Sequence, residues 1–242
     1  MTLFPDAMSP LLTESIIGRA LSRGIIEINF HQIRDYTKNK QKQVDDYPYG
    51  GGLGMIMNAD PLYNCWKAVK NDVPDARTIY LTPQGAVFNQ AKARELADKY
   101  KALILVCGHY EGVDERFIEE CVDEEISIGD FVLTGGEIPA LAVADAVFRL
   151  IPGVLSDEIC FNEESHYDGL LEYPQYTRPA VWREKAVPEI LLSGHHANIK
   201  KWRRREAIRR TLIKRPDMLK TVNLSPEDKL ILSELEEEQN NQ

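Results

Sequence analysis

The sequence predicts an α/β fold with a mainly parallel sheet, because apolar runs alternate with stretches of helical periodicity and end in glycine-rich loops. Strands are expected at 77–81 and 101–107, and helices follow them at 89–100 and 113–121. An alternation of this kind implies a mainly parallel sheet with helices on both of its faces.

The elements on either side of this core are predicted from capping residues and periodicity. Pro10 is expected to open a helix that Gly24 ends. A strand with partial alternation is expected at 25–33, and a further helix from about Asp60. An apolar helix at 138–150 completes the series.

Two glycine-rich loops, at 108–112 and 129–136, are expected to hold a ligand, because open α/β sheets bind ligands where strands end. Glycine lets the backbone approach a ligand closely, and Glu111, Asp130 and Glu137 lie in or beside these loops. The alternative is that the glycines only form tight turns. Neither loop has the spacing of a dinucleotide or phosphate-binding motif, which disfavours a nicotinamide-dependent or nucleotide-hydrolysing enzyme.

Two long polar segments interrupt the pattern. Residues 38–43 are expected to form a surface loop, and 50–54 to lie near the ligand site. Residues 151–179 show little periodicity, which is typical of a linker or of a lid that orders on substrate binding. The remainder predicts a small helical domain, with breaks at Pro188, Ser193-Gly194, Pro216 and Ser225-Pro226.

Composition indicates a globular protein that works in a reducing compartment. With 43% hydrophobic and 28% charged residues, the 242-residue chain can bury a sizeable core. No apolar run reaches the length of a membrane span, and no signal-peptide pattern opens the chain, so a cytoplasmic location is expected. The four cysteines lack the paired spacing of a zinc or redox centre; Cys107 and Cys121 are expected to be core thiols, and no metal ligands are assigned.

The net charge of −9 hides a strong asymmetry. Residues 200–215 carry nine Lys or Arg against the single Glu206, whereas the stretch after Ser225 is acidic. Such a block is often a solvated helical face, but its imbalance is too one-sided for a face of paired charges and favours RNA phosphates. The expected RNA-binding residues are His195, Lys200, Lys201, Arg203, Arg204, Arg205, Arg209 and Arg210.

Several runs resemble the bacterial tRNA (guanine-37-N1)-methyltransferase family of the SPOUT superfamily. They are LFPDAM, YGGGLGMIM, LTPQG, GHYEGVDERF, ISIGDFVLTGGE, RLIPGVL and SHYDGLLEYPQYTRP, and together they cover nearly the whole chain in one order. The resemblance implies a SPOUT-type parallel sheet with a deep C-terminal trefoil knot, followed by a small all-helical domain. It also implies a homodimer that binds S-adenosylmethionine in the knot loops.

The resemblance divides the chain into three parts. Residues 1–155 would be the knotted catalytic domain that binds S-adenosylmethionine, 156–180 an interdomain linker or lid, and 181–242 a helical tRNA-binding domain. Family members usually begin with a short apolar strand that leads into the Leu-Phe-Pro run. Almost nothing precedes Leu3 here, so that strand is expected to be missing or to begin upstream.

The implied reaction is methylation of N1 of guanine 37 in tRNAs with guanine at 36. It needs a carboxylate base near N1 and a cation or hydrogen-bond donor near O6. By resemblance, Asp168 matches the base and Arg149 the residue that stabilises the guanine. Glu111 is a third expected catalytic residue, for contacts to the donor or to Mg²⁺. Taken alone, Asp168 would more often form a turn, and Arg149 would more often be a helix-end charge.

The resemblance also names the positions that line the cofactor site. One of its loops carries His109 where the family often has arginine. The expected cofactor-binding residues are Pro83, Gln84, Gly85, Gly108, Tyr110, Gly112, Ile128, Gly129, Asp130, Phe131, Val132, Leu133, Gly135 and Gly136. Two alternatives remain open: a knotted methyltransferase that acts on another RNA position, and a non-catalytic RNA-binding protein that keeps a vestigial donor pocket.

Overall fold

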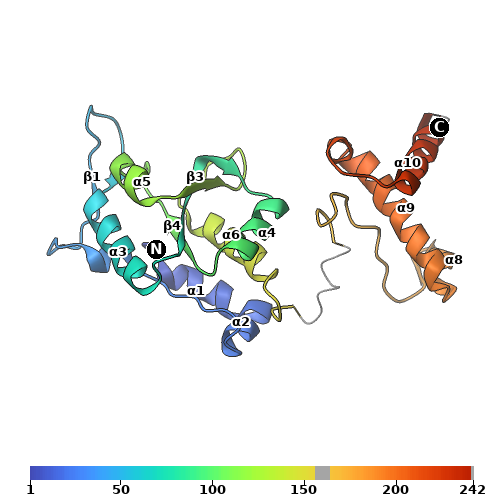
Figure 1. The fold of residues 1–242 in the computed structure, drawn as a ribbon, viewed down its shortest axis with the longest axis horizontal. Coiled ribbons are helices and arrows are strands. Elements are labelled where there is room, and N and C mark those ends of the chain that lie inside the picture. The colour runs from blue at the N-terminus through green and yellow to red at the C-terminus, as the bar shows by residue number, and fades with distance from the viewer. Residues whose placement is uncertain (156–163, 241–242) are drawn as a thin grey trace. The chain divides into compact units, whose positions relative to one another are not determined.

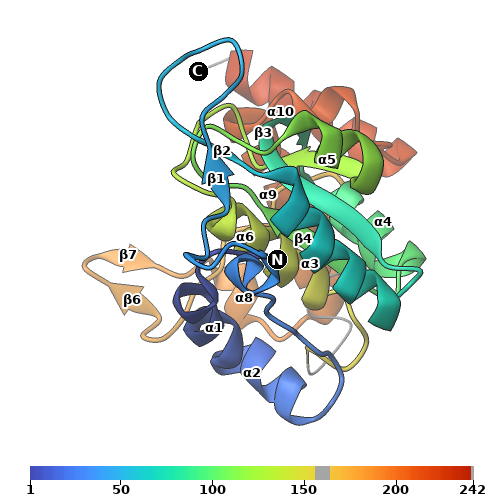
Figure 2. The same cartoon turned by 90° about the vertical axis from the view of Figure 1, so that its left-hand side faces the viewer.

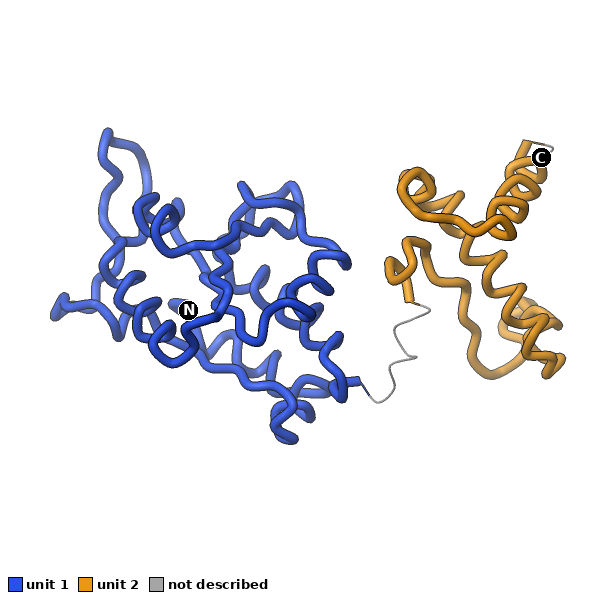
Figure 3. Tube along the Cα trace, in the orientation of Figure 1, with its two compact units in different colours: residues 1–156 blue, residues 157–242 orange. Residues whose placement is uncertain are grey.

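A computed structural model describes residues 1–155 and 164–240 of the chain. The chain divides into two compact units, Met1–Ser156 and Asp157–Gln242 (Figure 3). Separate hydrophobic clusters hold each unit together.

The first unit contains the predicted parallel sheet. Its strands are β3 (Arg77–Val87), β4 (Leu103–Cys107) and β5 (Glu124–Ser127), in the order β4-β3-β5, and both pairings are parallel. The register of β3 on β5 shifts between Leu81 and Ala86. The predicted strand 77–81 is therefore confirmed. The observed strand is longer than predicted, because β3 pairs with β5 again at 86–87 after an irregular stretch at 82–85.

Helices cover both faces of this sheet, as predicted (Figures 1 and 2). Ile79 and its neighbours on one face pack against α4 and α6, and Tyr80 and Ile104 on the other face pack against α3 and α5. This division follows from the alternation of side chains along a strand. The helices are α3 (Ala59–Asp72), α4 (Gln90–Lys99), α5 (Glu115–Cys121) and α6 (Glu137–Phe148).

Side-chain caps fix where two of these helices begin. The Asn89 side chain accepts a hydrogen bond from the Lys92 backbone N–H at 3.0 Å, and Asp114 accepts one from the Arg116 N–H at 3.0 Å. Such caps satisfy N–H groups that have no partner inside the helix. The helix expected from about Asp60 begins at Ala59.

The prediction of one helix from Pro10 to Gly24 is wrong. Two helices occupy this region, α1 (Pro5–Thr13) and α2 (Ser15–Ser22). Pro5 can open α1 because a backbone N–H in the first turn of a helix has no partner within the helix, so the N–H that proline lacks is not needed there. The break lies at Glu14, whose backbone is extended (φ −100°, ψ 165°), and at the adjoining Ser15, whose φ of 55° is left-handed.

The strand expected at 25–33 does not form; within the described residues, its pairing is confined to a parallel bridge between Thr2 and Gln32. Met1 and Thr2 lie between this segment and β4. The Met1 amino group donates to the Leu105 carbonyl at 2.9 Å, and the Thr2 N–H donates to the His31 carbonyl at 3.1 Å. Behind Met1 is a hollow of about 950 Å³, lined by Ile26, Ile28, Phe30, Leu103 and Leu105 among others. A strand needs a partner along its length, and among the described residues Thr2 alone pairs with this segment by a bridge.

The second unit is built mainly from helices, with the predicted breaks confirmed. Its helices are α8 (Glu189–Leu192), α9 (His196–Lys214) and α10 (Pro226–Asn240), with a 3₁₀ turn at Met218–Lys220. Leu170, Ile208 and Leu235 form the centre of its core. The expectation of an all-helical domain is wrong in one respect, because β6 (Val181–Trp182) and β7 (Lys185–Ala186) form a small antiparallel hairpin.

The hollow behind Met1 leads to a prediction about thermal stability. Fusing a short β-branched apolar extension to the amino group of Met1 should raise Tm by about 5 °C, because the extension can pair with β4 and fill apolar space. Thermal unfolding followed by circular dichroism measures this. A Gly-Ser extension of equal length is the control, and equal Tm values for the two extensions would contradict the prediction.

Candidate active site

Loops that leave the three parallel strands meet at one edge of the sheet. They span 82–85, 108–112 and 128–136. The Gly136 N–H donates to the Gly108 carbonyl at 2.8 Å, and His109 forms an antiparallel bridge with Gly135. This edge is where an open α/β sheet usually binds its ligand.

A fourth loop joins them from the N-terminal half of the unit, after the 3₁₀ turn Ile33–Tyr36. Strand β1 (Asp45–Asp46) pairs with β2 (Ile56–Met57), and the Glu111 N–H donates to the Met55 carbonyl at 3.0 Å. A Cβ on Gly54 would lie 2.4 Å from the Glu111 side chain. The glycine-rich loop at 50–54 therefore lies beside the site, as predicted, whereas residues 38–43 are exposed.

The loops enclose a pocket of about 400 Å³, a size that suits a small-molecule ligand. Glu111 lines it, and so do all the expected cofactor-binding residues except Gly85 and Asp130. Gly85 instead lies against β5, where an added Cβ would be 2.4 Å from the Ile126 nitrogen. Asp130 is exposed at the tip of its loop. The pocket residues that the sequence brings together in this way are Pro83, Gln84, Gly108, Tyr110, Gly112, Ile128, Gly129, Phe131, Val132, Leu133, Gly135 and Gly136.

Two glycines are required for the close approach of these loops. A Cβ on Gly136 would lie 2.7 Å from the Cys107 Cα and 2.9 Å from the Gly108 nitrogen. A Cβ on Gly108 would lie 2.9 Å from the Tyr80 ring, which is buried. Any side chain at either position would push the loops apart, so these residues set the shape of the pocket.

Sequence reasoning did not identify Tyr80 as a wall of the pocket, because it lies inside a strand and has the pattern of a core residue. Burial raises the pKa of its hydroxyl, which therefore stays protonated. His109 also lines the pocket, between the ring edges of Phe4 and Tyr110 at centroid distances of 5.1 Å each. Its buried Nδ1 has no hydrogen-bond partner among the described residues.

Cys107 ends β4 immediately before the Gly108 loop and is almost completely buried. Burial raises the pKa of its thiol to about 12. Cys65 and Cys121 are also buried and unpaired, which confirms the expectation of core thiols for Cys107 and Cys121. Cys160 lies outside the described residues.

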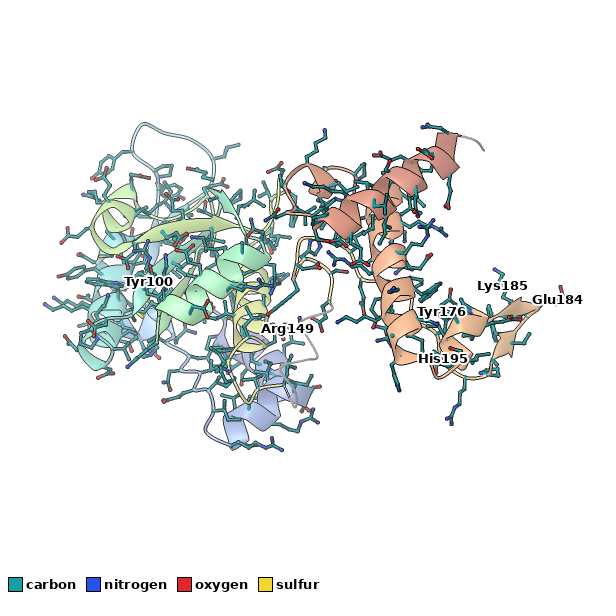
Figure 4. The ribbon with its side chains drawn as sticks, turned by 45° about the vertical axis from the view of Figure 1, so that its right-hand side comes forward. Tyr100, Arg149, Tyr176, Glu184, Lys185 and His195 are labelled. Atoms are coloured by element: carbon teal, nitrogen blue, oxygen red, sulfur yellow. The ribbon has the colours of Figure 1, made fainter. Side chains whose placement is uncertain are left out.

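Two of the expected catalytic residues lie in different units. Arg149 follows the last residue of α6 in the first unit (Figure 4). Asp168 lies in the loop that precedes Leu170 in the second unit. The approach of Arg149 to Asp168 stays a prediction.

The loop that carries Asp168 is anchored to the helices of its own unit. Leu170 is buried in the core of the unit, and the Leu171 N–H donates to the Thr211 hydroxyl of α9 at 2.9 Å. The Asp168 carboxylate accepts hydrogen bonds from the Leu170 N–H at 3.2 Å and from the Arg204 guanidinium. This part of the expected linker or lid is therefore tied to α9.

Arg204 also binds a second carboxylate. Its Nε and Nη2 donate to the two oxygens of Asp228 at 2.8 and 2.9 Å. The hydrogen bonds from Arg204 hold the pKa of Asp228 at about 2, against the opposing effect of burial. Because the pKa is lower in the folded state, the resulting stabilisation is present above the unfolded pKa of about 4 and is lost as pH falls towards 2.

The expectation that the basic block is too one-sided for paired charges is wrong for four of its arginines, one of which is Arg215 in an ion pair with Asp217. Arg204 is paired with Asp168 and Asp228. Arg205 forms ion pairs with Glu234 and Glu238, and Arg209 with Glu238 and Glu206. The partners come mainly from the acidic helix α10, which is distant in the sequence.

The remaining members of the block differ in their surroundings. Lys200 and Lys201 are exposed at the start of α9 and have no ion-pair partner in the described parts of the chain. His195 precedes the first residue of α9 and is also exposed (Figure 4). The Arg203 guanidinium stacks on the Tyr173 ring at 4.7 Å, and Arg210 donates to the Glu172 carbonyl at 3.4 Å.

Two other kinds of site are absent from residues 1–155 and 164–240. Within these ranges no three His, Cys, Asp or Glu side chains lie together as a metal site would require. No helix there combines the length and apolarity needed to cross a membrane.

Comparison with known proteins identifies a family. Residues 1–221 match the family described as tRNA (Guanine-1)-methyltransferase TrmD. The chain is 57% identical over 219 residues to a tRNA (guanine-N(1)-)-methyltransferase of Ruminiclostridium cellulolyticum, covering 90% of this chain and 94% of that protein. It is 52% identical over 241 residues to a protein of the same name from Alkaliphilus oremlandii, covering 97% and 96%.

The close contact at Gly136 makes a prediction about the pocket. Gly136→Ala should weaken binding of S-adenosylmethionine by about tenfold or more, because the added Cβ meets backbone atoms that cannot move cheaply. Isothermal titration calorimetry measures the affinity. Gly24→Ala is the control, since its Cβ meets nothing within 4 Å, it does not line the pocket, and its left-handed φ of 67° controls for general backbone strain. An unchanged affinity for Gly136→Ala would mean that the loops are not held as described.

Proposed function

The chain belongs to the tRNA (guanine-1)-methyltransferase family, and we infer that it transfers the methyl group of S-adenosylmethionine to N1 of guanine 37 in tRNA. The match over residues 1–221 carries this inference, because it includes the loops of the pocket and the loop of Asp168. The preferred substrates are tRNAs with guanine at position 36, by resemblance to the family.

We propose that the pocket of the first unit holds S-adenosylmethionine. The volume of about 400 Å³ suits a ligand of this size, and the glycines that line the pocket let the backbone come close to a ligand. Backbone N–H and C=O groups can recognise an adenine edge without charged side chains. When bound, the cofactor supplies an electrophilic methyl group, and the task of the loops is to hold it in line with N1.

The proton on N1 of guanine has to be removed for N1 to act as a nucleophile. We assign this role to the carboxylate of Asp168, which would accept the proton as the N1–methyl bond forms. Negative charge then develops towards O6, where the guanidinium of Arg149 would stabilise it. Glu111 lines the pocket and is proposed to contact the donor.

A homodimer would allow these residues to meet. Arg149 and Asp168 belong to different compact units, so a site that needs both has to be assembled from two bodies. We propose that Asp168 of one protomer reaches the pocket of the other, and that the loops at 108–112 and 128–136 form part of a trefoil knot. Both proposals rest on the resemblance to the family.

We further propose a cytoplasmic location, which suits an enzyme that modifies tRNA. Mg²⁺ can take part, as the resemblance implies, but the described residues contain no cluster of His, Cys, Asp or Glu that would hold it. The roles of Asp168 and Arg149 given above do not require the metal.

The reaction is tested with labelled S-adenosylmethionine and two transcripts of a proline or leucine tRNA with guanine at 36. One transcript keeps guanine at 37 and the other carries adenine there. Label should enter the guanine-37 transcript alone, and Asp168→Asn should reduce its transfer rate by about 100-fold or more.

Two other results would change the assignment. Label in both transcripts would show that the enzyme acts at another RNA position. Binding of the tRNA without any transfer of label would show an RNA-binding protein that has no methyltransferase activity.

The unpaired lysines of α9 make a separate prediction about tRNA binding. Lys200→Gln together with Lys201→Gln should reduce the slope of log affinity against log salt by about 0.7 for each phosphate that the protein no longer neutralises. Filter binding at several salt concentrations measures the slope. Lys220→Gln with Lys229→Gln removes the same charge elsewhere in the unit, and an equal effect of both pairs would refute a local contact.

A further inference from the structure

We propose that Arg204, held in place by Asp228, is a positioning residue for the carboxylate of Asp168. The inference rests on the proposed function, in which Asp168 is the general base. It replaces the expectation that Arg204 binds RNA phosphate, because all three nitrogen atoms of the guanidinium donate hydrogen bonds to carboxylates of its own unit.

The fixed end of this arrangement is Asp228 in the first turn of α10. Its side chain is only 8% exposed, the least exposed of the three charged groups. One of its oxygens also accepts a hydrogen bond from the Ser225 N–H at 3.2 Å, and the Ser225 hydroxyl accepts one from the Asp228 N–H at 3.1 Å. This reciprocal cap ties the carboxylate to the start of the helix.

Asp228 in turn fixes the orientation of Arg204. Two parallel hydrogen bonds, from Nε and Nη2, hold the guanidinium plane against the Asp228 carboxylate. The guanidinium is rigid and planar, so the direction of its remaining nitrogen, Nη1, is then determined. Nη1 donates to Asp168.

Asp168 is held from two sides, and part of its carboxylate stays accessible. One oxygen accepts from the Leu170 N–H and the other from Arg204. Its backbone is fixed by buried Leu170 and by Gly169, whose φ of 88° and contact with Val222 exclude a side chain. The Asp168 side chain remains 43% exposed, so it keeps lone pairs for the N1 proton.

The arrangement places one positive charge between two negative ones. Arg204 comes from α9 and Asp228 from α10, and the titratable neighbours of Asp168 in the sequence are His166 and Tyr167 of its own loop. Removing Arg204 takes away the cation that the two carboxylates share, whereas removing the charge of Asp228 leaves the guanidinium to Asp168 alone. The two changes should therefore move the ionisation of the base in opposite directions.

The test is the single-turnover rate of methyl transfer to the guanine-37 transcript as a function of pH, using the full-length protein. Arg204→Gln should lower the rate by about tenfold and move the acid limb of the profile to higher pH. Asp228→Asn should move that limb to lower pH. Arg204→Lys keeps the positive charge but loses the planar guanidinium with its two parallel hydrogen bonds. The acid limb should therefore stay at the same pH, and the rate of methyl transfer should fall.

Lys220→Gln is the control, because Lys220 is an exposed cation of the same unit that lies outside the basic block 200–215. Its profile should match that of the unmodified protein. If the Arg204 and Asp228 variants lower the rate or Tm without moving the acid limb, their role is structural and the proposal is overturned. Should Arg204→Gln fail to fold, Arg204→Lys and Asp228→Asn still decide the question.

The proposed function fails in a different way. If Asp168→Asn keeps the rate of the unmodified protein, Asp168 is not the base, whatever the Arg204 variants do. If Asp168→Asn removes activity while the Arg204 and Asp228 variants keep the unmodified profile, the base assignment stands and the positioning role is overturned.

Discussion

The parallel pairing of β3 with β4 and β5 is the constraint on which the site depends. Parallel strands bring their carboxyl ends to the same edge of a sheet, so the loops that follow Leu81, Cys107 and Ser127 start side by side. The hydrogen bond between Gly136 and Gly108 then joins two of them directly. The pocket is a product of this pairing and of the small residues that let the backbones touch.

In the second unit, charged side chains of opposite sign face each other on two helices, α9 and α10. Arg204, Arg205 and Arg209 lie on α9, and the acidic residues of α10 neutralise them. The cations of α9 that are available to bind RNA phosphates are therefore a smaller group, which includes Lys200 and Lys201 near the start of the helix. The helical unit thus carries both a candidate RNA contact and the candidate base, while the first unit carries the pocket.

Local signals predicted much of this arrangement. Strand ends, caps and glycine positions are encoded over a few neighbouring residues, which is why the loops, α4, α5 and the breaks between α8, α9 and α10 could be predicted. The break at Ser15 could not, since a left-handed serine has no local signature. Nor could the partners of Arg204, because Asp168 and Asp228 are distant in the sequence and are brought together only by packing.

The burial of Cys107 has a consequence for side reactions. A sulfonium compound is an alkylating agent, and a thiolate is among the strongest nucleophiles a protein contains. Cys107 directly precedes the loop that begins the pocket, and burial holds its pKa at about 12, so at neutral pH the sulfur is present as the thiol. The packing that fixes the end of β4 therefore also keeps this sulfur from acting as a nucleophilic thiolate.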